Sequence, residues 1–334
     1  MASKTNKKKK SAPRGSGRPD AHKLVAHGAK TAVAEKPIGI GDWIRTARPA
    51  TLGLAIAPVI SGWGIAMFNL TILADPRAIL LIQGPAVLAL FVAMFLQIGV
   101  NFANDYSDGI RGTDTHRVGP RRLTASGRVD PKRVRNLAFV FFGLAAASGL
   151  GLTVWKQIWW LPLVGLVAIA AAWFYTGGKR PYGYAGLGEL SVFTFFGLVS
   201  VLGTTYVLVQ SIWLEPILLG VAHGLFACAV LLANNMRDRE TDIVAGKRTL
   251  ATRVPMWLNR VLFGIYMLVP FVILGWFALT VFNAWWTYFA LCLAIPAVLI
   301  TSTARTAPEY VLALKLSVWT SLVFAGILAW ALAF

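Results

Sequence analysis

The sequence predicts an all-α polytopic membrane protein with nine transmembrane helices. Of its 334 residues, 57% are hydrophobic and only 14% are charged, which is unlike the balance of a soluble domain. Apolar runs of about eighteen residues recur along the chain, and a helix of that length can cross a bilayer. Cys228 and Cys292 both fall inside predicted spans, so they are expected to pack among apolar neighbours rather than form a disulfide or a zinc site.

The predicted spans follow a long polar tail. Residues 1–41 contain no apolar run and many lysines, which predicts a disordered basic cytoplasmic tail rather than a signal peptide. Residues 42–334 are expected to form the transmembrane domain, entered through an interfacial segment around Trp43 and opened by Pro49. We expect spans at about 51–68, 78–103, 136–155, 158–175, 187–209, 214–235, 260–281, 284–303 and 311–333.

The basic residues lie almost entirely on one side of this arrangement. Of the 32 Lys and Arg residues, only Arg77 and Lys156 fall in the alternate connections. The other 30 lie in the tail through Arg48 and in the connections 104–135, 176–186, 236–260 and 304–315. Because basic loops stay cytoplasmic, the N-terminus and these loops are expected inside and the C-terminus outside. This placement accounts for most of the net charge of +18 without nucleic acid as a partner.

The second predicted span ends in a polar stretch, QIGVNFANDYSDGIRGTD, at residues 97–114. Five of its side chains share one helix face by their spacing: Gln97, Asn101, Asn104, Asp105 and Asp108. A charged Asp deep in a bilayer costs about 2.5–3.5 kcal/mol, so such residues are typically functional; the alternative is that they are helix-end residues in water. Gly109 and Gly112 are expected to break the helix and leave Arg111 and Asp114 on a loop.

A second polar stretch, NNMRDRETDIVAGKRTLATR, follows the sixth predicted span at residues 234–253. Asn234, Asp238 and Asp242 are spaced by four residues, and both acidic stretches reach the same side of the membrane. Carboxylates bind hard cations such as Mg²⁺ through oxygen, and Lys or Arg neutralises the remaining charge of a phosphate. Two acidic clusters, each followed by basic residues, therefore predict a site for a Mg²⁺-bound diphosphate, because carboxylates packed this closely repel one another without a cation.

The candidate cations at this site are Arg111, Arg122, Arg180, Arg237, Lys247 and Arg253. For each of them the alternative is a charge that only sets topology. Residues 175–184 (YTGGKRPYGY) combine glycines, tyrosines and cations. This composition fits either a cap over the entrance of a substrate cavity or an ordinary interfacial turn. His223 lies on nearly the same helix face as Asn234, about three turns deeper, and either lines a cavity or is a satisfied interior histidine.

Other functional classes fit this pattern less well. A secondary transporter also buries carboxylates, but it favours broken helices and a site at the bilayer midplane. Here the acidic residues lie at helix ends on one face. A structural membrane subunit has no use for two matched acidic clusters, so the sequence favours an enzyme.

Two motifs, Asn104-Asp105-x-x-Asp108 and Asp238-x-x-x-Asp242, resemble the aspartate-rich motifs of the UbiA superfamily of intramembrane prenyltransferases. NDYSDGIRGTD, GPRRL, YTGGKRPYGYAGLGE and the 234–253 stretch are more narrowly similar to its 1,4-dihydroxy-2-naphthoate prenyltransferases, the MenA type. The resemblance runs from about residue 42 to the C-terminus. The superfamily usually carries an acid at the position of Gly112, whereas here, as in the MenA type, the acid is Asp114.

The resemblance implies a UbiA-type fold in the cell membrane, with the helices around a central cavity. Mg²⁺, or Mn²⁺ in its place, would bind a polyprenyl diphosphate whose chain lies in an apolar cavity that opens to lipid. The implied metal ligands are Asp105, Asp108, Asp238, Asp242, Asn101 and Asn104, and the four aspartates and Lys247 would be catalytic. The implied substrate-binding residues are Arg48, Arg111, Asp114, Arg122, Arg180, Tyr182, Tyr184, Asn234, Arg237 and Arg253.

The implied reaction is prenylation of 1,4-dihydroxy-2-naphthoate with loss of CO₂ and diphosphate, which gives a demethylmenaquinone. Physically, this acid requires a flat apolar slot and a cation for its carboxylate; Tyr182 and Tyr184 are candidates for the slot, and Arg180 or Arg48 for the cation. The acidic clusters do not select the acceptor, so 4-hydroxybenzoate, homogentisate and a haem remain alternatives.

Overall fold

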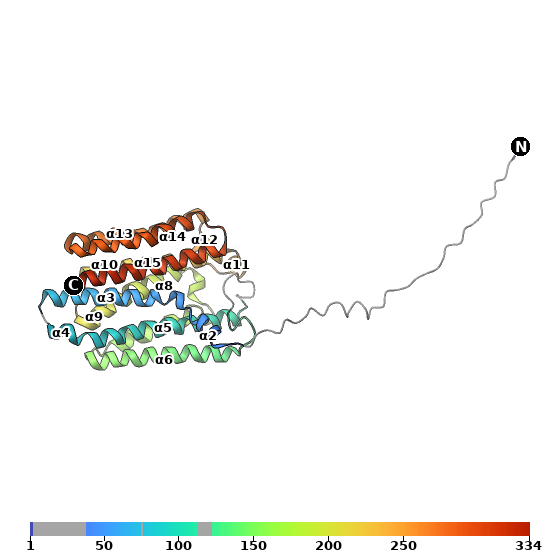
Figure 1. The fold of residues 1–334 in the computed structure, drawn as a ribbon. Coiled ribbons are helices and arrows are strands. Elements are labelled where there is room, and N and C mark those ends of the chain that lie inside the picture. Colours follow the sequence, from blue (N-terminus) through green and yellow to red (C-terminus); the bar gives the residue numbers. More distant parts are fainter. Residues whose placement is uncertain (3–37, 75, 113–121) are drawn as a thin grey trace. The chain divides into compact units, whose positions relative to one another are not determined.

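The helices of residues Gly39–Phe334 run side by side in one bundle (Figure 1). The computed structural model describes residues 1–2, 38–74, 76–112 and 122–334, and all regular elements in these ranges are helical. Most of the predicted tail, 1–41, and the candidate residue Asp114 lie outside the described ranges. The first half of the bundle contains α2 (Ile40–Ala47), η1 (Pro49–Thr51), α3 (Gly53–Ile72), α4 (Pro76–Leu81), α5 (Gln83–Ile110), α6 (Pro131–Lys156) and α7 (Leu161–Phe174).

The second half of the bundle begins with several short elements. Its elements are η2 (Tyr182–Ala185), α8 (Gly188–Val192), the π-helical η3 (Phe193–Val199), α9 (Ser200–Val209), α10 (Leu214–Arg237), α11 (Arg239–Val244), α12 (Leu250–Arg253), α13 (Met256–Thr280), η4 (Phe282–Ala290), α14 (Leu291–Thr303) and α15 (Ala307–Ala333). Helices α2, α11 and α12 lie at one end of the bundle, and the C-terminus lies at the other (Figure 1).

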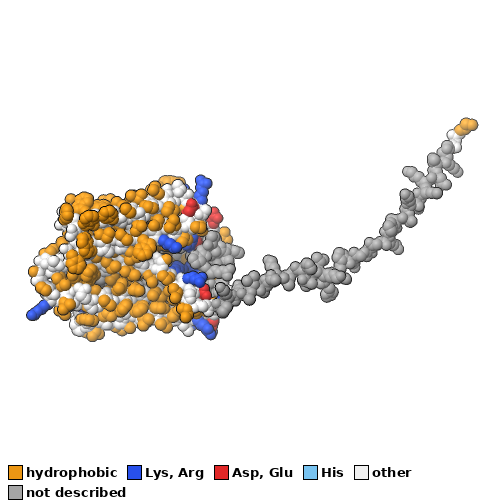
Figure 2. Space-filling model, in the orientation of Figure 1, with side chains coloured by type: hydrophobic (Ala, Val, Ile, Leu, Met, Phe, Trp, Pro, Cys, Tyr) orange, Lys and Arg blue, Asp and Glu red, His pale blue; other side chains and the backbone are white. Residues whose placement is uncertain are grey.

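Each of the nine predicted spans corresponds to a helical segment, but they are not all of spanning length. In the described ranges, eight segments are long and apolar enough to cross a membrane. The exception is α7, whose 14 residues rise only about 21 Å, less than the roughly 30 Å of a bilayer core. Hydrophobic side chains cover the visible flank of the bundle, and charged side chains gather mainly at one end (Figure 2). The chain is thus an integral membrane protein.

Helix α10 forms the centre of the bundle and packs against α3, η3, α13 and α15. His223 on this helix is fully buried, with its ring nitrogens 2.7 Å from Ser61 Oγ on α3 and 3.2 Å from Ser321 Oγ on α15. The histidine is therefore a satisfied interior residue that joins three helices. Helices α3 and α15 are also in close contact, since a Cβ on Gly64 would lie 2.6 Å from Cα of Ala329.

The two acidic stretches end differently from each other. Helix α5 continues past Gly109, so the expected break at that glycine is wrong. Gly109 instead permits close packing, because a Cβ there would lie 2.4 Å from Cβ of Thr124. The chain turns after Ile110, with Gly112 at a φ of +71° that favours glycine.

At the second stretch, α10 ends before Asp238 and α11 begins after it. The four-residue spacing survives this break, because the Asp238 N–H donates to Asn234 O at 3.2 Å and the Asp242 N–H to Asp238 O at 2.8 Å.

Candidate active site

A cavity of about 560 Å³ runs from the polar end of the bundle into its apolar interior. Side chains from α3, α5, α6, α7, η3, α9 and α10 form most of its apolar part. The predicted site residues that line its polar part are Arg48, Asn101, Asn104, Asp108, Arg122, Tyr182, Tyr184, Asn234, Asp238, Asp242 and Lys247. The fold therefore brings the two acidic stretches, 130 positions apart between Asp108 and Asp238, to one cavity.

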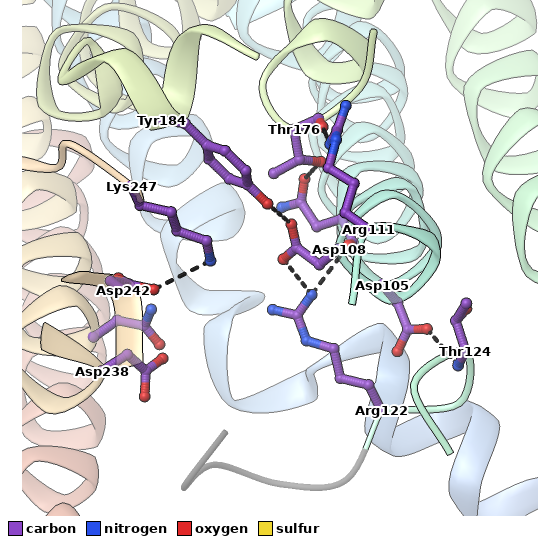
Figure 3. Close-up of polar contacts among 12 residues, drawn as sticks. Asp105, Asp108, Arg111, Arg122, Thr124, Thr176, Tyr184, Asp238, Asp242 and Lys247 are labelled. Atoms are coloured by element: carbon purple, nitrogen blue, oxygen red, sulfur yellow. Dashed lines mark hydrogen bonds and ion pairs between the residues drawn. The ribbon is translucent and has the colours of Figure 1, made fainter. Parts of the chain in front are cut away.

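Three carboxylates of this polar end form close ion pairs, and Figure 3 shows those of Asp108 and Asp242. Arg122 Nη1 lies 2.6 Å from an oxygen of Asp108, and Lys247 Nζ lies 3.2 Å from an oxygen of Asp242. Asp238 is bound by its sequence neighbour Arg237 through two nitrogens, at 2.6 and 2.7 Å. The carboxylates are buried, so the pairing compensates for much of the cost of removing these charges from water.

Tyr184 of η2 lies between the two acidic clusters (Figure 3). Its hydroxyl donates to Asp108, while Lys247 Nζ is 4.8 Å from the centre of its ring. The guanidinium carbon of Arg111 is 5.7 Å from the same ring. A cation over a tyrosine ring is attracted by its quadrupole, so Tyr184 links the first acidic cluster to Lys247 of the second.

Gln97 and Asn101, the deeper polar residues of α5, bind the segment that leads into the first span. Gln97 Nε2 donates to Thr51 Oγ1 at 3.2 Å, and Asn101 Nδ2 donates to Ala47 O at 2.9 Å. Between these two contacts lies Arg48, whose φ of +53° is unusual for a residue other than glycine. The two amide side chains thus fix the corner that places Arg48 in the cavity wall.

Asn104 and Asp105, nearer the end of α5, bind two further loops. Asn104 Oδ1 accepts a hydrogen bond from Thr176 Oγ1 at 2.7 Å. The two carboxylate oxygens of Asp105 accept from the backbone N–H groups of Leu123 and Thr124, at 3.1 and 2.9 Å. Asp105 therefore positions the segment that carries Arg122, and Arg122 in turn pairs with Asp108.

Five predicted residues lie outside the lining of the cavity among the described residues: Asp105, Arg111, Arg180, Arg237 and Arg253. Arg111 donates to the carbonyls of Thr176 and Gly178 and so holds the 175–184 loop. Arg253 Nη2 donates to Ala185 O at 2.6 Å, one residue after that loop. Arg180 is exposed on the loop itself.

Several residues of the cavity wall were not predicted from the sequence. Thr51, Asn235, Thr241 and Thr249 line the cavity with hydroxyl or amide groups. Asn235, Thr241 and Thr249 lie within the second acidic stretch, whose composition was the available signal. The local sequence does not indicate that Thr51 lines the cavity, because its position depends on a contact with Gln97, which is 46 positions away.

Two tyrosines in the 175–184 loop remain protonated at neutral pH. Desolvation raises the pKa of Tyr175 above its usual range, and desolvation also raises the pKa of Tyr182. The Tyr182 hydroxyl therefore stays a donor, and it donates to Ala171 O at 2.8 Å. The rings of the two tyrosines meet edge to face, with centres 5.5 Å apart.

The donor set of the polar end fits Mg²⁺. Asp108, Asp238, Asp242 and the amide of Asn234 offer oxygen atoms to one cavity, and oxygen is the donor that this cation prefers. Within the described residues, no three His, Cys, Asp or Glu side chains converge on one point. Such a set suits Mg²⁺ held by one or two carboxylates together with phosphate oxygens and water.

Comparison with known proteins gives the chain a family. The UbiA prenyltransferase family matches residues 63–311. The 1,4-dihydroxy-2-naphthoate octaprenyltransferase of Mycobacterium tuberculosis is 47% identical over 222 residues, which cover 66% of this chain and 73% of that protein. The enzyme of the same name from Escherichia coli is 39% identical over 219 residues, 64% of this chain and 68% of that protein.

The fold is shared with solved structures as well. A UbiA homologue from Archaeoglobus fulgidus, solved with GPP and Mg²⁺, superposes with a TM-score of 0.60 at 16% identity, over 87% of this chain and 99% of that one. The same homologue with DMAPP and Mg²⁺ gives a TM-score of 0.56. The resemblance predicted from the two aspartate-rich motifs is therefore confirmed, and the chain belongs to the UbiA prenyltransferase family.

Proposed function

We propose that this protein transfers a polyprenyl group from a polyprenyl diphosphate to 1,4-dihydroxy-2-naphthoate, with release of CO₂ and diphosphate, to give a demethylmenaquinol, the reduced form of a demethylmenaquinone. The observation that carries the proposal is the cavity that joins three carboxylate–cation pairs to an apolar interior. The names of the relatives from M. tuberculosis and E. coli support the choice of acceptor.

The polar end is suited to a diphosphate with Mg²⁺. Asp108, Asp238 and Asp242 would hold the cation, and Arg122 and Lys247, which also line the cavity, would contact phosphate oxygens. Bound Mg²⁺ would supply positive charge that stabilises the leaving diphosphate.

The residues of the first stretch that face neighbouring loops have a different proposed role. Asp105 lies outside the cavity lining, and both its oxygens accept from backbone N–H groups of another segment. The Oδ1 of Asn104 accepts from Thr176 of the 175–184 loop. Asn101 uses its Nδ2 on the backbone of Ala47. We therefore propose that these three residues, expected from the resemblance to be metal ligands, position Arg48, the 175–184 loop and Arg122.

The chemistry requires the allylic C–O bond to break, with its electron pair leaving on the diphosphate. Arg122 and Lys247 stabilise the charge that develops on the leaving oxygen. The apolar wall below them excludes water from the allylic carbon, which would otherwise be hydrolysed. The electron-rich ring then forms the new C–C bond, and loss of CO₂ returns an electron pair to the ring.

The acceptor requires a cation for its carboxylate near this carbon. Arg48 lines the cavity, whereas Arg180 is exposed outside its lining. We therefore propose Arg48 for this contact, with Tyr182 and Tyr184, which line the same part of the cavity, beside the aromatic ring.

The site is proposed to face the cytoplasm from a multi-pass protein of the cell membrane. The one-sided distribution of Lys and Arg supports this orientation. The C-terminus at the opposite end of the bundle from α11 and α12 fits a C-terminus outside (Figure 1). Residues 1–41 are proposed as a basic cytoplasmic tail and 42–334 as the catalytic domain.

Membranes that contain the protein would test this function with an isotope-labelled polyprenyl diphosphate and separate ring acceptors. We expect a product with the mass of demethylmenaquinol, or of demethylmenaquinone once air has oxidised it, from 1,4-dihydroxy-2-naphthoate, and none from 4-hydroxybenzoate or homogentisate. Chelation of divalent ions should abolish turnover, and Mg²⁺ should restore it, with Mn²⁺ as a second ion to try. Turnover of 4-hydroxybenzoate or homogentisate alone would overturn the proposed acceptor while leaving the prenyl transfer intact.

A further inference from the structure

The second acidic stretch folds back onto the end of the 175–184 loop just beyond Lys247. The Arg248 N–H donates to Tyr184 O at 2.9 Å, which joins the backbones of the two segments. The backbone of Lys247 is also tied to the metal-site helix, because its N–H donates to Asp242 O at 2.9 Å. How these backbones meet therefore sets the contact between Lys247 Nζ and the Tyr184 ring, whose centre is 4.8 Å away (Figure 3).

Arg253 makes a second connection between the same two segments. Its Nη2 donates to Ala185 O at 2.6 Å, and its Nε donates to Arg248 O at 3.1 Å. These carbonyls belong to the residues that directly follow Tyr184 and Lys247. One guanidinium group can bind both because its N–H groups form a rigid planar fork. We call this pair of hydrogen bonds the Arg253 clamp.

Gly186 leaves the space that the clamp occupies. A Cβ built on this glycine would lie 2.7 Å from Cζ of Arg253, 2.9 Å from its Nη2 and 3.0 Å from Arg248 O. Its φ of +85° is also in the region that favours glycine. A larger residue at this position must therefore push the guanidinium group away from Ala185 O.

The location of Arg253 argues against direct contact with the diphosphate. Arg253 is exposed and lies outside the cavity lining, whereas Arg122 and Lys247 line its polar part. Two of its nitrogens are already bound to carbonyls. Any effect of Arg253 on the reaction must therefore pass through the residues beside the clamp, Tyr184 and Lys247.

We propose that Arg253 is a positioning residue for prenyl transfer: the Arg253 clamp holds Tyr184 against Lys247 and so keeps the two acidic clusters aligned across the cavity. This inference rests on the proposed function. The single backbone bond from Arg248 to Tyr184 leaves the loop free to pivot, and the clamp supplies a second attachment point that prevents the movement.

Hydrogen–deuterium exchange of Arg253→Ala in detergent tests the clamp without any substrate. The reporting amides are those of Tyr184 and of residue 248, and we expect them to exchange about fivefold or more faster. Arg248→Ala is the matched control, because it removes a second exposed arginine of the same stretch but keeps the backbone groups that the clamp uses. The control should change exchange at Tyr184 by less than about twofold, and exchange in α10 and α15 should stay unchanged in both variants.

Kinetics then test whether the clamp acts through Tyr184. We expect Arg253→Ala to lower kcat/KM by about fivefold or more and Arg248→Ala by less than about twofold. Arg253→Lys should recover part of the loss, because an ammonium keeps the charge but lacks the fork that reaches both carbonyls. In the double variant of Arg253→Ala with Tyr184→Phe, the combined loss should be clearly smaller than the product of the two single losses, because both changes disturb the same alignment.

Gly186→Ala provides a second route to the same result with Arg253 left in place. Its added Cβ displaces the guanidinium group, so exchange at Tyr184 should rise as in Arg253→Ala. Gly127→Ala is the matched control for backbone strain, since Gly127 is exposed and has a φ of +68°, but a Cβ there would meet nothing within 4 Å. This control should leave both exchange at Tyr184 and kcat/KM within about twofold of the unaltered protein.

Three results would overturn the positioning role. They are unchanged exchange at Tyr184 in Arg253→Ala, single losses that multiply fully in the double variant, and equal effects of Gly186→Ala and Gly127→Ala. Full multiplication would instead indicate that Arg253 contacts the diphosphate itself. Failure of the proposed function is a separate observation, because the unaltered protein would then not prenylate 1,4-dihydroxy-2-naphthoate, while the exchange measurement would still report on the clamp.

Discussion

The hydroxyl of Tyr184 donates a hydrogen bond to a carboxylate oxygen of Asp108, across 76 positions of the sequence. The other oxygen of Asp108 pairs with Arg122, so two segments hold one carboxylate in a fixed orientation. The ring of the same tyrosine lies under Lys247, which pairs with Asp242 (Figure 3). A single loop side chain therefore aligns the acidic clusters of both halves of the bundle.

Tyr184→Phe is predicted to lower kcat/KM by roughly ten- to a hundredfold. The change keeps the ring between its cations but removes a hydrogen bond to a charged group, which is typically worth about 1.5–3 kcal/mol. Steady-state kinetics with both substrates would measure the effect.

Tyr288→Phe is the matched control for this prediction. It also removes one tyrosine hydroxyl bond, to Phe271 O at 3.1 Å, outside the cavity lining. Its kinetics should change less than about twofold. Equal losses in the two variants would contradict an alignment role for Tyr184.

Asp105→Ala and Asp108→Ala are predicted to fail in different ways. Loss of Asp105 leaves the N–H groups of Leu123 and Thr124 without their acceptor, at a cost of about 1–3 kcal/mol each if they stay buried. We therefore expect a lower Tm and lower activity, but a nearly unchanged half-saturating Mg²⁺ concentration. Asp108→Ala should instead raise that concentration by about tenfold or more, because Mg²⁺ loses a carboxylate ligand.

Mg²⁺ titration of prenyl transfer, together with thermal unfolding in detergent, separates the two effects. Asp242→Ala is a second metal-site variant, and it should resemble Asp108→Ala. A Mg²⁺ shift in Asp105→Ala as large as in these two variants would show that Asp105 is a metal ligand after all.

The difference between these two aspartates shows what local sequence can and cannot determine. Asp105 and Asp108 share one helix face, and their periodicity correctly indicated a polar stripe at the end of a span. Which of them faces the cavity depends on where residues 122–124 and Tyr184 fold back, and no local pattern contains that information. The positions of the spans, by contrast, follow from local hydrophobicity, so they were predicted within a few residues.

The same limit applies to the length of α7. The sequence predicted a span at 158–175, but the structure has a helix of only 14 residues there, Leu161–Phe174. Trp160 and Gly177, just beyond its ends, are held by contacts with the neighbouring turns, including the Gly177 N–H to Trp173 O at 2.9 Å. The ends of α7 thus depend on its packing partners, which hydrophobicity alone does not specify.

The orientation in the membrane is predicted to place α11 and the start of α6 in the cytoplasm. Single cysteines at the exposed positions Glu240 and Lys132, in a background with Cys292→Ala, should react with an impermeant maleimide only from the cytoplasmic side. Arg77→Cys, exposed at the connection between α3 and α5, is the control and should react only from outside. Reaction of all three cysteines from one side would refute the arrangement.

Arg48→Ala is predicted to raise KM for 1,4-dihydroxy-2-naphthoate about tenfold or more, with a much smaller change in KM for the prenyl diphosphate. The reason is that Arg48 lines the cavity at a corner fixed by Gln97 and Asn101, where a carboxylate of the ring can reach a guanidinium. Arg180→Ala is the matched control, because Arg180 is a second loop arginine that lies exposed outside the lining. Arg48→Lys should recover part of the loss, since Lys keeps the charge but not the two parallel bonds of a guanidinium. If Arg180→Ala raises the acceptor KM and Arg48→Ala does not, the carboxylate binds at the 175–184 loop instead of at the entry to the first span.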